Sequence, residues 1–464
     1  MLAAALLLRM TQLGNPAIEV DEQFYLLVGD RLLHGQLLYL DIWDRKSPGV
    51  FAIYAAIRLL GGVGIVQYQL VATAVAAATA WVVSRIVRNI AGEWPAIVAG
   101  LSYLLWIGTV GGDGGQAPVF YNLPMAGGAA LVLRALRAED AQRFNGQAIG
   151  AMALVGLAIQ IKYTAAIEGL FFGLVLTWQA HKRNPRAATV MLVLTCAFAA
   201  ILPTMIAFSV FAYLGAAHEF WFANFQSIGL RDTTPGGPNR LMVDFQLSLV
   251  LGACCAASWW QLRKESDPQI RQWRLFLLGW LVAAVLGFLC VGAFFYHYLL
   301  PVYLPLSIGG APIFRRQPIG TALATLALWS PFSASGWPND KDRVEAQAMT
   351  TSLAALVPSQ VDRGCMQMFD GPPILYHLTH ACFASRWAFP THLMSAVEAP
   401  AIGVDPTAEM RRLIAARPLV LVAPLVMESN SAAVAILRAG IARSYRLKGT
   451  VLYEDRPIAV YVSR

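Results

Sequence analysis

Charged side chains are scarce in this sequence. Asp, Glu, Lys and Arg make up 13% of its 464 residues, about half of the fraction that is usual in soluble domains. Hydrophobic residues make up 57%. This composition excludes an ordinary soluble domain. The apolar residues gather in long runs separated by short basic stretches, which is typical of serial bilayer crossings.

Repeats with a solenoid period and low-complexity tracts are also missing. The first apolar run begins at Met1 and contains Arg9, without the basic start and the small-residue cleavage site of a signal peptide. The number and length of the apolar runs lead us to expect an all-α polytopic membrane protein with about eleven transmembrane helices. Its spans are expected near 1–13, 63–83, 94–110, 118–133, 147–161, 164–180, 187–213, 241–262, 275–295, 299–314 and 318–333.

The orientation of the chain follows from its basic residues, which fall in alternate connections, as the positive-inside rule requires of cytoplasmic loops. This regularity holds only if residues 50–60, which contain Arg58, form a helix on the membrane surface and do not cross the membrane. The first outer loop, 14–49, and everything after about residue 335 then face the periplasm. Cytoplasmic anchoring accounts for the net charge of +8, so no nucleic acid partner is expected.

The stretch 336–464 differs in its pattern of apolar and polar residues from the membrane part, 1–335. The membrane part is expected to carry the catalytic groups. Helical patterns surround an apolar strand signal, LVLVAP, and a closing hairpin, RLKGTVLYEDRPIAVYVS. A small periplasmic α/β domain is predicted, with helices near 340–356, 407–416 and 431–443. Cys365 and Cys382 are its only cysteines. An oxidising compartment would let them form a disulfide, although two separate buried thiols would look the same in sequence.

An acidic pair, Asp21 and Glu22, opens an amphipathic helix in the first outer loop. Phe24, Leu27 and the Leu32–Leu33 pair of this helix can point to the membrane. A carboxylate beside a bilayer is partly desolvated, which suits a general base. The alternative is a helix cap, because acidic residues at a helix start interact favourably with the helix dipole.

The residues that follow the acidic pair carry a family resemblance. They are His34-Gly35, Tyr39, Asp41 and Asp44-Arg45-Lys46-Ser47-Pro48. Their order resembles the first outer loop of the GT-C superfamily of membrane glycosyltransferases. The likeness is closest to bacterial relatives of the dolichyl-phosphate-mannose protein mannosyltransferases and of the lipid A aminoarabinose transferases. Ser47 replaces the first proline of the family's Lys-Pro-Pro-like turn, whereas Lys46 and Pro48 are retained. Segments 294–305, 373–379 and 385–390 are also similar to family stretches.

The resemblance implies an inverting hexosyl- or pentosyltransferase in the bacterial inner membrane. Its donor would be a sugar on a polyprenyl phosphate, and its acceptor a hydroxyl of a glycolipid, a polysaccharide or a protein. Asp21 would be the base, Lys46 would bind the donor phosphate, and Glu22 would orient one of these groups or the acceptor. A single displacement needs no covalent nucleophile. No cofactor and no metal are expected.

Three further polar residues on the outer face are candidates for binding the donor phosphate: His297, Lys162 and Arg231. Each has a plainer explanation, because a lone histidine at a helix end often only packs, a lysine at a span end reaches lipid headgroups, and a loop arginine is often only solvated. Arg231 could also close a lid over the site. Sugar or acceptor contacts are expected from Tyr25, Asp44, Asp113 and Tyr298.

Other function classes stay open at this point. A lipid or sugar flippase would also be polytopic, but it would carry ionisable groups at the bilayer midplane or interrupted helices in two matched halves. A non-catalytic scaffold protein would not need Asp21 and Lys46, so substitutions at these two positions would be tolerated. Among enzymes, a polysaccharide ligase or polymerase that uses a lipid-linked oligosaccharide is the nearest competitor.

Overall fold

The computed structural model of the protein describes residues 1–232, 237–427 and 431–464. The chain divides into two compact units. Unit 1 comprises Met1–Thr11, Gln69–Ala207 and Pro235–Pro338. Unit 2 comprises Gln12–Tyr68, Phe208–Thr234 and Asn339–Arg464.

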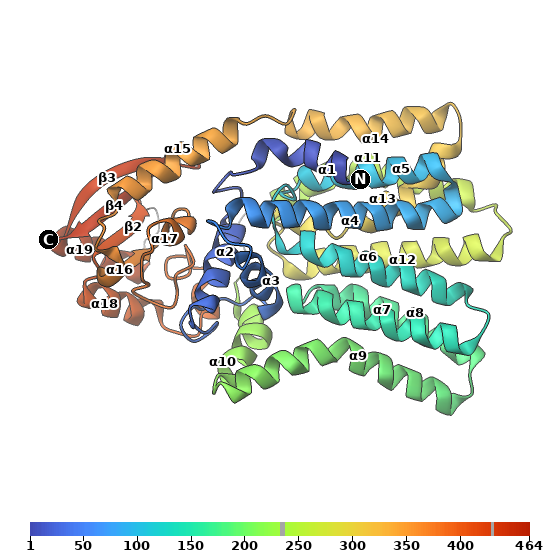
Figure 1. The fold of residues 1–464 in the computed structure, drawn as a ribbon, viewed down its shortest axis with the longest axis horizontal. Coiled ribbons are helices and arrows are strands. Elements are labelled where there is room, and N and C mark those ends of the chain that lie inside the picture. The colour runs from blue at the N-terminus through green and yellow to red at the C-terminus, as the bar shows by residue number, and fades with distance from the viewer. Residues whose placement is uncertain (233–236, 428–430) are drawn as a thin grey trace. The chain divides into compact units, whose positions relative to one another are not determined.

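Unit 1 consists of apolar helices. Helices α6, α7, α8 and α12 pack side by side, and α5 packs with α13 and α14 (Figure 1). The helices of this part of the chain are α1 (Leu2–Arg9), α4 (Ile65–Ala91), α5 (Glu93–Gly108), α6 (Ala117–Arg137), α7 (Ala141–Ile161), α8 (Ala165–Arg183), α9 (Arg186–Tyr213), α11 (Gly237–Leu262), α12 (Pro268–Val291), α13 (Tyr303–Gly310) and α14 (Ile319–Ser335).

Six helices within the described ranges are long and apolar enough to cross a membrane: α4, α6, α7, α9, α11 and α12. In α9 only 11% of the most apolar stretch is buried by protein, so this helix exposes the surface that lipid would cover. A helical, multi-pass membrane protein is therefore confirmed, and the count of about eleven spans stays a prediction. The expected span 299–314 is not one helix. Its α-helix, α13, has eight residues between 3₁₀ turns, because the prolines of this segment remove helix hydrogen bonds.

Arg9, the charge within the first apolar run, is buried in unit 1. Its guanidinium donates to the carbonyl of Gly112 and, at 3.5 Å, to that of Gly114. These carbonyls belong to the glycine-rich turn between α5 and α6. The buried charge thus satisfies backbone groups that the turn leaves without helix partners.

Unit 2 combines short helices with a mixed sheet of order β1-β2-β4-β3. Its helices are α2 (Val20–Leu33), α3 (Pro48–Arg58), α10 (Ala217–Trp221), α15 (Lys341–Leu356), α16 (Val361–Gly364), α17 (Ile374–Leu378), α18 (Pro406–Ala416) and α19 (Ala432–Ser444). Its strands are β1 (Met366–Met368), β2 (Val420–Pro424), β3 (Tyr445–Tyr453) and β4 (Arg456–Ser463). Strand β1 is parallel to β2, and β4 is antiparallel to both β2 and β3. The predicted small α/β sheet, with its closing hairpin, is confirmed.

The core of unit 2 lies between the sheet and helices α18 and α19. Leu413, Leu421 and Leu437 are fully buried there, and Trp43 of the first loop packs into the same cluster. The first loop and the C-terminal segment therefore share one core. Cys365 and Cys382 form a disulfide beside the hydrogen bond from the Met366 amide to the Cys382 carbonyl.

Candidate active site

Helices α2 and α3 cross closely in unit 2, and this crossing positions the acidic pair. A Cβ on Gly29 of α2 would lie 2.7 Å from the backbone of Tyr54 and Ala55 in α3, so only glycine allows the helices to approach this far. Arg58 of α3 donates to Asp30 of α2 at 2.8 Å. The first turn of α2 is thereby held near the residues that lead into α3.

Two of the apolar residues of α2 that could face a membrane are instead buried in protein, whereas Leu33 is exposed. Phe24 and Leu27 are fully buried, and the Phe24 ring meets Phe389 edge-on at 5.1 Å. The amphipathic pattern of α2 arises because the helix packs inside unit 2.

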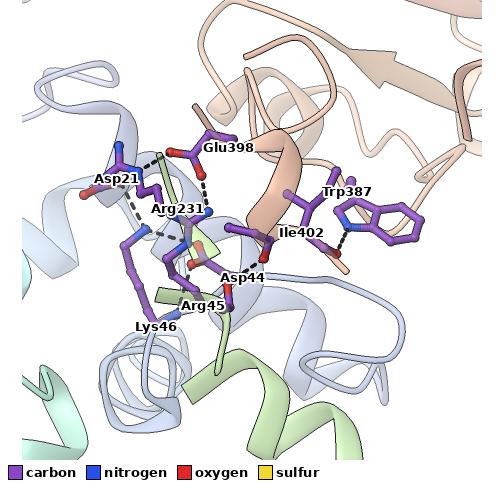
Figure 2. A network of polar contacts seen from close by, with 10 residues as sticks. Asp21, Asp44, Arg45, Lys46, Arg231, Trp387, Glu398 and Ile402 are labelled. Carbon is purple, nitrogen blue, oxygen red and sulfur yellow. Dashed lines mark hydrogen bonds and ion pairs between the residues drawn. The ribbon is translucent and has the colours of Figure 1, made fainter. Parts of the chain in front are cut away.

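Lys46 lies between two carboxylates (Figure 2). Its Nζ donates to Asp21 Oδ1 at 3.2 Å and to Asp44 Oδ2 at 3.1 Å. Asp44 is buried, with 1% of its side chain exposed, whereas 19% of Asp21 and 25% of Lys46 are exposed. Asp21 is the second residue of α2, and the cap position is held by Glu19. Its carboxylate faces Lys46 across the loop, which a helix-capping role alone does not explain.

The position of Lys46 is fixed by aromatic side chains and by its own backbone. Nζ lies 5.2 Å from the Tyr25 ring centre and 5.0 Å from that of Phe389. The Tyr39 hydroxyl donates to the Lys46 carbonyl at 2.8 Å. Burial alone would lower the pKa of Lys46, but the carboxylates of Asp21 and Asp44 raise it above its usual value. The ammonium is therefore charged at every physiological pH.

A second ion-pair network joins three segments that are far apart in the sequence (Figure 2). Glu398 accepts from Arg45, and its other oxygen lies 2.9 Å from Arg231 Nε. All three side chains are between 12% and 14% exposed. Arg231 is thus held by Glu398 and is not merely solvated. Residues 233–236 of the loop that was considered as a lid lie outside the described residues.

His392 lies close enough to three cations, Arg45, Lys46 and Arg231, for their charges to act on its ring. It is buried, and its ring packs against Trp43 at 5.0 Å and Phe389 at 4.9 Å. Burial holds the pKa of His392 well below its usual value, and the charges of Arg45, Lys46 and Arg231 lower it further. Burial and the three neighbouring cations therefore favour the neutral imidazole of His392.

The other predicted residues of unit 2 are placed as follows. Glu22 is fully buried, and its charge adds to the effect of burial in raising the pKa of Tyr54. Tyr25 is buried, with its hydroxyl 3.5 Å from Asp21 Oδ2. Tyr25 and Asp44 thus directly contact the two groups, Asp21 and Lys46, on which the expected chemistry depends. Glu22 is not accessible to a substrate.

Four predicted residues belong to unit 1. Lys162 Nζ lies 4.1 Å from the centre of the Tyr298 ring, and His297 packs edge-on against the same ring at 4.5 Å. Lys162 is therefore not a purely headgroup-directed side chain. Asp113 is partly exposed in the turn between α5 and α6. The expected contacts of these residues with a donor stay predictions.

The arrangement in unit 2 can hold an anion and accept a proton. Lys46 is charged and partly exposed, and Asp21 beside it is a partly exposed carboxylate. Within the part of the chain that the structure describes, no group of three or more His, Cys, Asp or Glu side chains could hold a metal ion. The charged Lys46 is suited to electrostatic binding, and the Asp21 carboxylate to general base catalysis.

Comparisons with known proteins bear on the fold of the chain. The family model described as dolichyl-phosphate-mannose-protein mannosyltransferase matches residues 45–206. ArnT from Cupriavidus metallidurans, in a crystal structure bound to undecaprenyl phosphate, aligns over 99% of this chain and 96% of its own, with 14% identity and a TM-score of 0.68. The chain therefore shares the fold of this ArnT structure. The resemblance to GT-C membrane glycosyltransferases is thus confirmed.

A second solved structure shares the fold with a lower TM-score. An oligosaccharyltransferase from Archaeoglobus fulgidus, tethered to an acceptor peptide, aligns over 100% of this chain and 74% of its own, with 11% identity and a TM-score of 0.51. No curated protein matches the chain by sequence.

Several residues of the site carry no signal in the sequence. Glu398 and His392 stand alone in an irregular segment, and Asn224, which donates to the Tyr39 hydroxyl at 2.9 Å, lies in a single π turn after α10. A π turn is frequent at functional sites, but it is visible only in the structure.

Proposed function

We propose that this protein is an inverting glycosyltransferase that moves a sugar from a polyprenyl phosphate to a hydroxyl acceptor at the periplasmic face of the bacterial inner membrane. The observation that carries the proposal is Lys46, held between Asp21 and Asp44. A similar GT-C structure, that of ArnT, binds undecaprenyl phosphate, which is the lipid portion of such a donor. We also propose that the donor carries a monosaccharide, that transfer inverts the anomeric configuration, and that the protein lies in the inner membrane.

The donor phosphate competes with Asp21 for Lys46. Asp44 is the buried partner of Lys46 and keeps it in place, whereas Asp21 is partly exposed and can give way. When the donor phosphate replaces Asp21 as the partner of the Lys46 ammonium, the Asp21 carboxylate no longer has a cation beside it. It then binds a proton more tightly, which makes it a stronger base. Donor binding thus prepares the base for its task.

Transfer is then a single displacement. The acceptor oxygen forms a bond to the anomeric carbon as the bond from this carbon to the phosphate oxygen breaks. The proton of the acceptor goes to Asp21, and the electron pair of the broken bond leaves with the phosphate, whose growing charge Lys46 stabilises. Attack opposite the leaving group inverts the anomeric configuration.

Arg45 and Arg231 are proposed to support the phosphate from the second network. Both arginines share Glu398, so this group carries one net positive charge. Glu22, because it is buried, is proposed to support the start of α2 and not to touch the acceptor.

Mass spectrometry of envelope glycans and glycolipids from a deletion strain and from wild type tests the proposal. Loss of one sugar residue from one glycan is expected and would identify the donor sugar and the acceptor together. Loss of a whole oligosaccharide would instead favour a ligase or polymerase. Accumulation of an unmodified lipid-linked sugar on the cytoplasmic side would indicate a flippase, and unchanged glycans would contradict the proposal.

A further inference from the structure

An open groove of about 520 Å³ lies in unit 2, outside the residues assigned to the transfer chemistry. It is lined chiefly by Gln36, Asp41, Phe383, Ser385, Arg386 and Glu409, and we call it the polar groove. Its volume falls within the roughly 300 to 1,000 Å³ that small-molecule sites occupy. Most of its lining is polar, which is unlike a lipid-binding cavity.

The floor of the polar groove is built from buried polar side chains. Ser385 and Glu409 are each only 5% exposed. The Ser385 hydroxyl donates to Glu409 Oε1 at 2.7 Å, and Arg412 Nε donates to Glu409 Oε2 at 2.8 Å. The carboxylate is therefore held in one orientation by partners on both oxygens, as in a preorganised binding site.

Two polar atoms of the lining have no partner among the described residues. They are Nε of Arg386 and Oε1 of Gln36, and both are shielded from solvent. Buried polar atoms in folded proteins are nearly always hydrogen-bonded. Because both atoms are shielded, a ligand in the groove does not meet them directly. The Arg386 guanidinium, which lines the groove, lies 4.4 Å from the centre of the Trp387 ring.

The charges of the groove balance. Arg412 neutralises Glu409, and Arg386 and Asp41 contribute one charge of each sign. An anionic ligand would meet two carboxylates and a cationic ligand two guanidiniums. A neutral sugar fits better, because each hydroxyl both donates and accepts, and its C–H face can pack on Phe383, which lines the groove.

We propose that the polar groove binds a neutral saccharide portion of the acceptor. The inference rests on the proposed glycosyl transfer, which requires an acceptor hydroxyl. The loop that supplies Gln36 and Asp41 also supplies Lys46, and its Trp43 amide donates to the Arg386 carbonyl at 2.8 Å. The five steps along the chain from Asp41 to Lys46 span at most about 18 Å when extended, so an oligosaccharide can reach from the groove to the base.

Ligand-observed NMR on the purified full-length protein tests the proposal without using its activity. The probes are mannobiose, chitobiose and maltotriose, with mannose 6-phosphate as an anionic comparison. Saturation transfer is expected to at least one neutral probe at millimolar concentration, whereas any signal from mannose 6-phosphate, which the proposed phosphate site at Lys46 can bind, should not change in the groove variants. Arg386→Ala and Gln36→Ala should each lower this signal several-fold.

Arg411→Ala is the matched control, because Arg411 is exposed on α18 and does not line the groove. It should bind the probes like wild type, and thermal unfolding should show that all variants are folded. Equal binding by wild type and by both groove variants, or no binding of any neutral probe, would overturn the inference. Neither result would affect the proposed transfer reaction, which is tested independently through Asp21.

Discussion

Lys46 is held by two carboxylates that differ in exposure, and this difference predicts how its removal acts. Lys46→Ala should weaken donor binding and also lower turnover, by about 10²-fold or more, because the leaving phosphate loses a cation in a poorly solvated site. Initial rates at varied donor concentration separate the two effects. Lys448→Ala, an exposed lysine on β3, is the control. A Lys46→Ala protein with unchanged apparent donor affinity would contradict the phosphate-binding role.

The lowered pKa of His392 predicts that the stability of the protein depends on pH. Its pKa is well below the usual value in the folded protein because of burial and the neighbouring cations. Between the folded and unfolded pKa values the unfolded chain binds more protons, so the free energy of unfolding decreases as the pH falls below about 6.5. Thermal unfolding of the purified protein from pH 7.5 to pH 5 should show a falling midpoint.

His392→Gln removes this group, so the midpoint of the variant should fall less steeply with pH than that of wild type. His218→Gln, an exposed histidine of α10, should keep the wild-type slope. Parallel slopes for wild type and His392→Gln would show that the imidazole is not the group responsible.

Individual site residues differ in how far sequence could predict them. Asp21 and Lys46 lie in one short loop whose order of residues resembles a family, so they could be named before the structure. Glu398 and His392 could not, because each becomes part of the site only through folding. Arg45 and Glu398, for example, are 353 positions apart.

At the scale of elements, the crossing of α2 and α3 at Gly29 has a direct consequence for the site. Gly29→Ala would press a methyl group against the α3 backbone, which cannot move as a side chain can. Overpacking of this kind costs about 1–3 kcal/mol. It should also shift Asp21 relative to Lys46 and reduce transfer. Thermal unfolding and a transfer assay measure the two effects.

Gly146→Ala is the matched control, because a Cβ at this position of α7 meets no atom within 4 Å. It should leave the free energy of unfolding within about 0.5 kcal/mol of that of wild type. If Gly29→Ala is as stable and as active as Gly146→Ala, the close crossing does not position the acidic pair.

Elements with strong periodicity were predictable, and elements defined by tertiary contacts were not. The β3–β4 hairpin and helices α15, α18 and α19 follow from local patterns. Strand β1 has only three residues, MQM, and exists because β2 offers it a parallel partner. The pattern that includes Phe24 and Leu27 correctly predicted an amphipathic helix, but the surroundings of these two residues were predicted wrongly. An apolar stripe looks the same in sequence whether protein or lipid covers it.

For the whole molecule, composition and charge pattern predict the topology. A reporter fused after Arg88 should be cytoplasmic, and one fused at Arg464 should be periplasmic, because the basic connections alternate only if residues 50–60 do not cross the membrane. Paired alkaline phosphatase and green fluorescent protein fusions measure this. Both positions on the same side would reject the orientation.

The membrane class was predictable because it depends on summed composition. The association of the first loop with the C-terminal segment in unit 2 was not, because contacts between residues hundreds of positions apart leave no periodic trace in one sequence. Trp43 in the core beside α18 and α19 is the clearest case.

The most direct test of the central claim is transfer by Asp21→Asn in a reconstituted assay with a polyprenyl-phosphate sugar. Asparagine keeps the size of the side chain but cannot accept the proton, so turnover should fall by about 10² to 10⁴-fold while donor binding is largely kept. Asp362→Asn, an exposed residue of α16, should transfer sugar like wild type. If Asp21→Asn transfers sugar at the wild-type rate, Asp21 is not the base and the proposed mechanism is wrong.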